Sequence, residues 1–296
     1  MVSKTGRTFA QAKVNLALRI LGRNADGYHS IETVFLRLEL ADSIVVRLTE
    51  RARSLRCESM AGADPESNLG FRAATLFAAE RGWPRGFEID IEKHIPIGGG
   101  LGGGSADAAA VLRILNTLAP QPVSAERLLG MAAQLGSDVP FLTSGYLMAL
   151  ATGRGEIMTP LPPLPARKLV LLAPSREMST ADAYARVAAT RGTYQPRSKT
   201  LTAEMFRSWD TVARHSVNEF EPLVGDEIPE IRSWLEVGAR LGILTRLSGS
   251  GSTVFMVDTG TKDSLQAAIA SLALDADATV IRTSTAASVV PVEILD

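Results

Sequence analysis

The chain has 296 residues, a formal net charge of −1 at pH 7 and a single cysteine, and these values exclude several classes of protein. Hydrophobic residues make up 46% and charged residues 21%, close to the usual values for globular domains, which excludes disordered, collagen-like and coiled-coil chains. The charge balance lacks the basic excess of a dedicated nucleic-acid binder. Cys57 alone forms neither an internal disulfide nor a Cys-rich zinc site.

The N-terminal segment carries no signal for export or membrane insertion. Lys13 and Arg19 interrupt the apolar run that a signal peptide needs. No stretch approaches the roughly 18 uninterrupted apolar residues of a membrane span. We therefore expect a cytoplasmic protein with no membrane partner.

The first third of the chain alternates between strand and helix patterns. Residues 13–20 have a period of two and predict a half-buried strand, with one apolar face formed by Val14, Leu16, Leu18 and Ile20. The elements that follow are a turn at 24–27, strands at 33–40 and 43–48, a helix at 67–81 and a strand at 87–93.

A glycine-rich run at 98–104 leads into two predicted helices. We expect the first helix at 105–118 with Ser105 as its N-cap, and the second at 124–135 with Ser124 as its N-cap. Pro140 comes soon afterwards and ends the second helix, because its ring prevents helical continuation.

A proline-rich stretch at 160–165 is the best candidate for a linker between two halves of the chain. After it, the sequence predicts strands and helices in alternation, at 168–173, 181–190, 210–221, 229–241, 253–258, 262–274 and 278–283. Such alternation favours helices packed on a sheet. The expected class is an α+β protein with domains at 1–162 and 163–296.

The strongest local signal for chemistry is the glycine-rich segment Pro96-Ile97-Gly98-Gly99-Gly100-Leu101-Gly102-Gly103-Gly104-Ser105. Glycines leave backbone N–H groups uncovered and permit positive φ, and the helix that follows adds the positive end of its dipole. Together these features predict a phosphate cradle. No Gly-Lys-Ser/Thr ending supports a Walker loop, and Pro96 interrupts the strand-to-glycine step of a dinucleotide-binding fold. The bland alternative is a flexible linker.

Four weaker candidates each have a bland alternative. The Ser-Gly-Ser-Gly-Ser turn at 248–252 is a second anion nest or a tight turn before a strand. Asp138 is a general base, a metal ligand or a turn residue. Lys13 faces a phosphate or carboxylate, or is a solvated charge on a strand. Tyr28 and His29 stack on a base or pack within a loop.

Six motifs in order resemble the GHMP kinase superfamily: Ala12-Lys-Val-Asn-Leu16, Gly22 to His29, the glycine-rich segment, Leu135 to Pro140, Gly153 to Glu156 and Leu247 to Gly251. The glycine-rich and Ser-Gly motifs indicate only the superfamily. The Asp-Gly-Tyr-His and Gly-x-Asp-Val-Pro segments, with Ala-Lys-x-Asn, resemble members that act on a cytidylyl sugar alcohol in the non-mevalonate isoprenoid pathway.

The resemblance implies an N-terminal domain like that of ribosomal protein S5, a ferredoxin-like C-terminal domain and ATP in the cleft between them. It makes Asp138 the catalytic aspartate and Lys13 the active-site lysine, and it assigns Pro96 to Ala106 to the triphosphate. Tyr28, His29 and Tyr184 would contact the cytosine, with Asn15 near the substrate phosphates or the catalytic pair. Gln11 and Ala106 depart from the family pattern, and Ala106 removes a hydroxyl from the phosphate site.

The implied reaction is transfer of the ATP γ-phosphoryl group to the substrate 2-hydroxyl, with Mg²⁺ accompanying ATP and no ligand assigned to the metal. We expect a monomer or weak homodimer without nucleic-acid partners. Three alternatives stay open: another small-molecule kinase of the superfamily, a catalytically silent nucleotide- or sugar-binding regulator, and a nicotinamide-dependent dehydrogenase.

Overall fold

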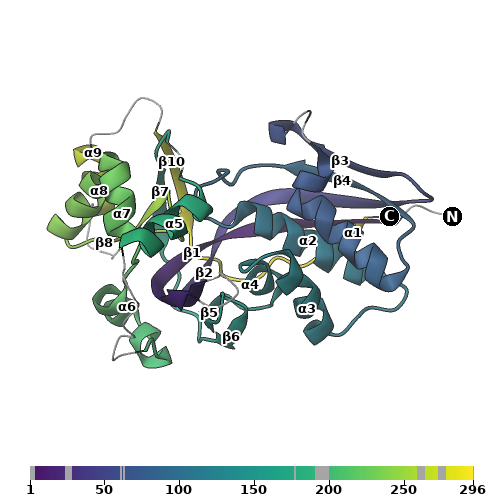
Figure 1. The fold of residues 1–296 in the computed structure, drawn as a ribbon, viewed down its shortest axis with the longest axis horizontal. Coiled ribbons are helices and arrows are strands. Elements are labelled where there is room, and N and C mark those ends of the chain that lie inside the picture. The colour runs from purple at the N-terminus through teal and green to yellow at the C-terminus, as the bar shows by residue number, and fades with distance from the viewer. Residues whose placement is uncertain are drawn as a thin grey trace.

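The computed structural model describes residues 4–23, 29–60, 62, 64–176, 178–190, 200–258, 264–272 and 278–295. Two mostly antiparallel sheets lie toward opposite ends of the molecule, and the two long N-terminal strands of the larger sheet extend toward the smaller one (Figure 1). The predicted α+β class is confirmed. None of the helices in these ranges is long and apolar enough to cross a membrane.

The larger sheet has the strand order β11-β1-β2-β4-β3, with β5 and β6 added along β2. Its strands are β1 (Thr5–Arg23), β2 (His29–Thr49), β3 (Arg53–Cys57), β4 (Gly86–Glu92), β5 (Met148–Thr152), β6 (Ile157–Pro160) and β11 (Glu293–Leu295). The helices of this half are α1 (Leu69–Arg81), α2 (Gly103–Leu118), α3 (Ala125–Leu135) and α4 (Val139–Thr143). Helix α2 packs against α1, α3, α4 and both long strands, so it is the central helix of this half.

The smaller sheet has the strand order β10-β7-β9-β8. Its strands are β7 (Lys168–Ala173), β8 (Leu244–Leu247), β9 (Val254–Val257) and β10 (Thr279–Ser284). The helices of this half are α5 (Thr180–Thr190), α6 (Trp209–His215), α7 (Glu221–Glu227), α8 (Pro229–Arg240) and α9 (Ser264–Ser271). Three short 3₁₀ helices lie at Glu58–Met60, Pro65–Ser67 and Ala203–Phe206.

Strand β1 is buried on both faces, whereas the alternation predicted a half-buried strand. Val14 and Leu16 pack in the hydrophobic core of the larger half, while Leu18 packs in that of the smaller half. The opposite face is also covered, because Lys13 and Asn15 are each only 2% exposed. The second half of the chain lies against β1: the Leu18 N–H donates to the Val217 carbonyl at 2.7 Å. A strand covered by two domains keeps its polar residues inside.

Several predicted boundaries are corrected by the structure. The two strands expected at 33–40 and 43–48 are one strand, β2, because Ala41 and Asp42 continue the pairing with β1. The helix expected at 210–221 is two helices, because Pro222 lies at the start of α7 and cannot continue α6. Pro140 likewise lies at the start of a new short helix, α4.

Ser105 is not the N-cap of α2. The N-cap is Gly102, which has a left-handed φ of 73° and provides no side-chain capping hydrogen bond. Ser124 does cap α3, as predicted, and accepts a hydrogen bond from the Arg127 N–H. Strands β3, β5, β6, β8 and β11 carry no clear alternation in the sequence and were not expected.

The C-terminus returns to the larger sheet. Strand β11 pairs antiparallel with the start of β1, so that the two chain ends lie side by side (Figure 1). The coil at 161–167 leads from β6 of one sheet into β7 of the other. The boundary expected at residue 162 stays a prediction, and the last strand belongs spatially to the first half.

Candidate active site

Lys13 and Asp138 face one another although 125 positions separate them in the sequence. The Lys13 ammonium lies 3.2 Å from a carboxylate oxygen of Asp138. The lysine side chain is 3% exposed and that of Asp138 is 30% exposed, so the carboxylate is the member of the pair that a substrate can reach. Asp138 is the N-cap residue of α4, but its side chain makes no capping hydrogen bond. The carboxylate pairs with Lys13 instead.

The position of the lysine is fixed by further contacts. Its ammonium donates to the Asn15 side-chain oxygen at 2.7 Å and to the Gly100 carbonyl at 2.9 Å. The Asn15 amide in turn donates to the Thr33 hydroxyl on the neighbouring strand. Asn15, predicted near the substrate phosphates or the catalytic pair, therefore holds Lys13. Three oxygen partners keep the ammonium aimed at one point, which suits a catalytic charge.

The glycine-rich segment forms a tight loop ahead of α2. Gly98, Gly100 and Gly102 alternate with their neighbours and have φ values of 73°, 74° and 73°, which L-residues with side chains rarely adopt. The loop ends at the N-terminus of the sixteen-residue helix α2, where unpaired N–H groups and the helix dipole favour anions. This geometry fits a phosphate cradle.

The Ser-Gly-Ser-Gly-Ser turn at 248–252 packs directly on this loop. The Ser248 hydroxyl donates to the Gly100 carbonyl at 2.9 Å, and the Thr253 N–H donates to the Gly99 carbonyl at 3.2 Å. A Cβ at Gly100 would lie 2.1 Å from the Ser248 carbonyl oxygen, so only glycine permits this approach. The turn thus fixes the glycine loop from the other half of the chain, and the flexible-linker alternative is wrong.

A cavity of about 340 Å³ opens between the loop, α1, α4 and α5. Its lining includes the loop residues Pro96 to Ser105 together with Ser67, Asn68, Leu69, Lys93, Asp107, Asp138 and Thr180. Ala106, predicted to contact phosphates, is not part of that lining; it lies in the first turn of α2, is 2% exposed and packs in the core. The glycine loop and Asp138 therefore line one cavity.

Two of the three rings predicted to recognise a base come together. The His29 and Tyr184 rings stack with centroids 4.9 Å apart, and Tyr184 meets Phe220 edge-on. Burial, with a smaller contribution from the charge of Asp138, raises the pKa of Tyr184 above its usual range. Tyr28 lies outside the described residues. The stacked rings therefore join the start of β2 to α5, and the charge of Asp138 reaches Tyr184.

Arg37 supports the helix that carries Asp138. Its guanidinium is 1% exposed and donates to the carbonyls at the end of α4 and just beyond it, those of Phe141, Leu142, Ser144 and Tyr146. Burial, helped by the charge of Arg113, lowers the pKa of Arg37 to about 9, so it remains charged at neutral pH. A cation at a helix C-terminus satisfies its free carbonyls.

The sequence did not point to several cavity residues. Asn68 caps α1 by accepting hydrogen bonds from the Gly70 and Phe71 N–H groups, and it lines the cavity. Thr180 lies at the start of α5 and shares a hydrogen bond with Ser250. Lys93 carried one available signal, because the chain has only six lysines and this one lies three residues before the glycine loop.

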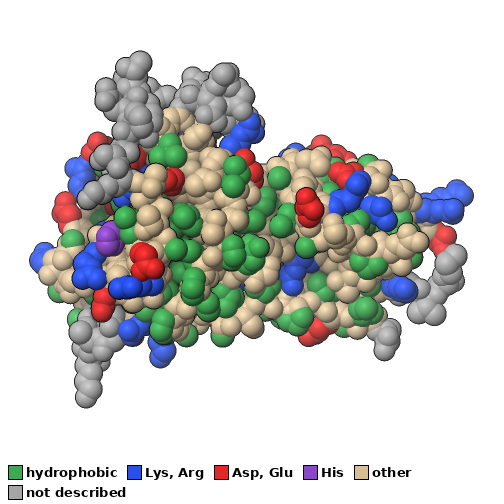
Figure 2. All heavy atoms as spheres, turned by 90° about the horizontal axis from the view of Figure 1, so that it is seen from below, with side chains coloured by type: hydrophobic (Ala, Val, Ile, Leu, Met, Phe, Trp, Pro, Cys, Tyr) green, Lys and Arg blue, Asp and Glu red, His purple; other side chains and the backbone are tan. Residues whose placement is uncertain are grey.

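The face drawn in Figure 2 carries interspersed charges of both signs toward its two ends and mostly hydrophobic or uncharged side chains between them. No continuous basic surface appears on the described part of this face. The described residues also contain no group of three or more His, Cys, Asp or Glu side chains able to hold a metal ion. The cavity is lined by the glycine loop and by the charged side chains of Lys93, Asp107 and Asp138.

Comparison with known proteins identifies the class that this fold and site define. The N-terminal domain model of the GHMP kinases matches residues 68–146, and their C-terminal domain model matches residues 192–276. The chain belongs to the GHMP kinase family. The family's two-domain fold confirms the expected architecture, and the dehydrogenase alternative is wrong.

Particular members of the family are similar over most of the chain. A protein of Desulfitobacterium hafniense (strain Y51), named 4-diphosphocytidyl-2-C-methyl-D-erythritol kinase, is 41% identical over 86% of this chain and 88% of its own length. A protein of the same name from Desulfotalea psychrophila is 39% identical over 84% of each chain. A crystal structure of 4-(cytidine 5'-diphospho)-2C-methyl-D-erythritol kinase matches with a TM-score of 0.75 and 34% identity, over 95% of this chain and 99% of that one.

A more distant solved structure shares the fold alone. The homoserine kinase from Cytophaga hutchinsonii matches with a TM-score of 0.68 over 100% of this chain and 98% of its own, at 16% identity.

Proposed function

We propose that this chain phosphorylates the 2-hydroxyl of 4-diphosphocytidyl-2-C-methyl-D-erythritol with ATP, giving the 2-phosphate and ADP in the non-mevalonate isoprenoid pathway. The observation that carries the proposal is the cavity that the glycine loop and Asp138 line together, with the Lys13 ammonium 3.2 Å from the Asp138 carboxylate. The relatives of that name supply the substrate class. The glycine loop would bind the phosphates, and the acceptor hydroxyl would reach the Asp138 carboxylate in the same cavity.

In the proposed reaction the acceptor oxygen forms a bond to the γ-phosphorus while the bond to the β–γ bridging oxygen breaks. The acceptor proton passes to Asp138, or is oriented by it, and ADP leaves. Such transfers depend mainly on positioning and on charge neutralisation. The Lys13 ammonium, 3.2 Å from the carboxylate, keeps an opposite charge beside Asp138 and beside the transferred phosphoryl oxygens.

The glycine loop would hold the triphosphate through its backbone N–H groups. Mg²⁺ usually binds through one or two carboxylates together with substrate phosphates. The cavity lining offers carboxylates but no complete metal cage among the described residues, which fits an ion that arrives on ATP. That ion would neutralise phosphate charge.

His29 and Tyr184 are proposed to face the cytosine, with Tyr28 beside them. Aromatic faces bind bases by stacking, and an imidazole adds a hydrogen bond to a base edge. His29 and Tyr184 stack on one another, and the charge of Asp138 reaches Tyr184. We therefore propose that one substrate molecule places its base at these rings and its acceptor hydroxyl at Asp138.

The test is coupled ADP release with ATP, Mg²⁺ and each of three alcohols: 4-diphosphocytidyl-2-C-methyl-D-erythritol, homoserine and mevalonate. We expect turnover with the cytidylyl substrate alone. Turnover only with another alcohol would overturn the substrate assignment but keep the kinase. Binding of ATP without turnover on any of the three would overturn the enzyme and favour a silent regulator.

A further inference from the structure

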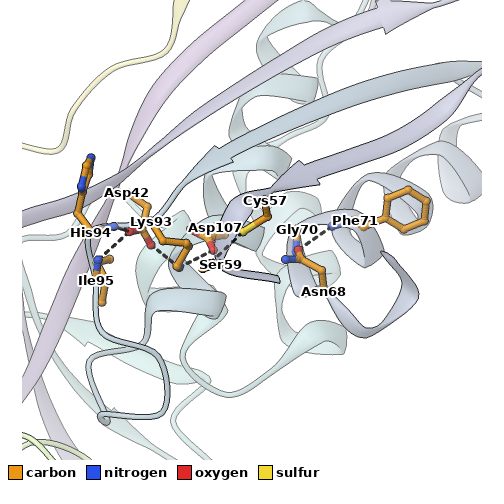
Figure 3. A network of polar contacts seen from close by, with 10 residues as sticks. All are labelled: Asp42, Cys57, Ser59, Asn68, Gly70, Phe71, Lys93, His94, Ile95 and Asp107. Atoms are coloured by element: carbon orange, nitrogen blue, oxygen red, sulfur yellow. Dashed lines mark hydrogen bonds and ion pairs between the residues drawn. The ribbon is translucent and has the colours of Figure 1, made fainter. Parts of the chain in front are cut away.

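Three charged residues meet at the base of the glycine loop without being part of the Lys13–Asp138 pair. Lys93 lies between two carboxylates and donates to both Asp42 and Asp107, the latter at 2.8 Å (Figure 3). The side chains of Asp42 and Asp107 are 0% and 3% exposed, and that of Lys93 is 12% exposed. We name this set the Asp42–Lys93–Asp107 cluster.

The cluster contacts the chain on both sides of the loop. Ahead of the loop, one Asp42 oxygen accepts the N–H groups of His94 at 2.5 Å and Ile95 at 2.8 Å. Beyond it, Asp107 lies on the second turn of α2, fourteen positions after the lysine. At the start of the helix, a Cβ on Gly103 would lie 3.3 Å from the Lys93 ammonium. The ion pairs therefore close the loop across its base.

The cluster also reaches the cavity. Lys93 and Asp107 both belong to the cavity lining, and one oxygen of Asp107 is buried without any hydrogen-bond partner. The Lys93 ammonium donates to both Asp42 and Asp107, so its hydrogen bonds are directed into the cluster. The Lys93 ammonium holds the two carboxyl groups together. We assign anion binding to the backbone N–H groups of the loop.

We propose that the Asp42–Lys93–Asp107 cluster positions the phosphate loop and thereby sets the affinity for the nucleotide, without contacting the acceptor alcohol. The proposal rests on the proposed function for the identity of the anion, and it deepens that function. Its residues are positioning residues. The acceptor alcohol is assigned to Asp138, whose ion-pair partner Lys13 donates to the Gly100 carbonyl.

Direct binding of a non-hydrolysable ATP analogue by titration calorimetry, with KM for ATP and for the acceptor alongside, tests the proposal. Asp107→Ala removes the link to α2, and we expect the dissociation constant of the analogue to rise by about fivefold to thirtyfold. Asp107→Asn keeps the shape of the side chain and a hydrogen-bonding oxygen, so the dissociation constant should rise less in this variant. KM for the acceptor should stay within about twofold in both variants.

The matched control is Asp90→Asn. Asp90 lies on β4, the strand that leads to Lys93. Its carboxylate pairs at 2.7 Å with the exposed side chain of Arg56 and not with the cluster. We expect its nucleotide affinity to match that of the wild type. Lys93→Arg keeps the charge, and it should retain more affinity than Lys93→Met.

Two results would overturn the positioning role. The first is an unchanged dissociation constant in folded Asp107→Ala. The second is an equal rise of KM for ATP and for the acceptor together with a fall in melting temperature, which would mark a general structural role. Because the calorimetry needs no turnover, an inactive wild type that binds the analogue would overturn the proposed function while leaving the cluster testable.

Discussion

The Asp138 side chain is 30% exposed and lies 3.2 Å from the Lys13 ammonium. We therefore propose that it accepts or orients the proton of the acceptor hydroxyl. Asp138→Asn keeps the shape and removes the proton acceptor. We expect kcat to fall by about 10²- to 10⁴-fold, with ATP affinity within a few-fold. Steady-state kinetics and nucleotide titration measure the two values. The control is Glu126→Gln, an exposed carboxylate in the first turn of α3. Retained turnover in the Asp138 variant would remove that residue from the chemistry.

Asp107 gives the stability of the protein a pH dependence with a definite sign. Burial raises the pKa of Asp107 to about 7; the charge of Lys93 opposes the rise and that of Asp42 adds to it. In the unfolded chain an aspartate has a pKa of about 3.9. Between about pH 4 and pH 7 the unfolded state therefore binds fewer protons than the folded state, and this group lowers the free energy of unfolding as the pH rises.

Asp107→Asn removes that contribution. We expect the free energy of unfolding of the wild type, relative to the variant, to fall by about 1 kcal/mol or more from pH 4.5 to pH 8. Urea denaturation at three pH values across this range measures the difference. Parallel pH profiles for the two proteins would show that Asp107 ionises as it does in water.

Among the α-helices of the described residues, α4 is the shortest, and Asp138 stands directly before it. Its five residues are too few to hold a fixed position alone, and Arg37 ties its C-terminal carbonyls to β2. In Arg37→Met we expect kcat to fall by about tenfold with ATP affinity changed far less, because Asp138 loses its fixed aim. Arg37→Lys should recover part of the rate. An equal loss of kcat in both variants would contradict a role for the four carbonyl contacts.

The loop and the Ser-Gly turn also act as a pair of elements. Gly100→Ala places a Cβ 2.1 Å from the Ser248 carbonyl oxygen at a φ of 74°. We expect a loss of about 1–3 kcal/mol of stability and weaker ATP binding. In the control, Gly130→Ala, the added Cβ meets nothing within 4 Å on α3, and a gain of about 0.5–1 kcal/mol is expected. Thermal denaturation and nucleotide titration compare them, and equal stabilities would contradict the close approach.

The sequence predicted the elements that bury a continuous apolar face, such as α2 and α3. It failed for β3, β5, β6, β8 and β11, which are three to five residues long and too short to show a period. It also failed for the break between α6 and α7, where only Pro222 marks the boundary. Local patterns predict elements whose own residues decide their structure, and they miss those imposed by neighbouring strands.

At the scale of the whole molecule, the last strand closes the structure. Strand β11 pairs with the start of β1, and the Gln11 side chain donates to the Ser288 carbonyl at 3.0 Å. Deletion of residues 288–296 exposes the edge of β1, and we expect the melting temperature to fall by about 5 °C or more. The control, Glu293→Ala, removes only the exposed ion pair with Arg7 and should shift it by about 2 °C at most. An unchanged melting temperature in the deletion variant would contradict this closing role.

The candidate site was predictable only as far as motifs reach. Lys13, Asp138 and the glycine run stand in recognisable segments, so their roles followed from the family resemblance. Asp42, Lys93 and Asp107 come from β2, the end of β4 and α2, and no spacing in the sequence marks them as partners. Contacts between distant segments depend on the packing of the whole chain. That is why the cluster at the base of the loop became visible only in the structure.

The central claim is that the shared cavity transfers a phosphoryl group from ATP to the cytidylyl alcohol. Phosphorus-31 NMR of the reaction of the wild type with both substrates and Mg²⁺ tests it most directly. The account predicts one new monophosphate ester resonance for each ADP formed, with the diphosphate of the acceptor intact and no product from Asp138→Asn. ADP accompanied only by inorganic phosphate, or an equal yield of ester from the variant, would contradict it.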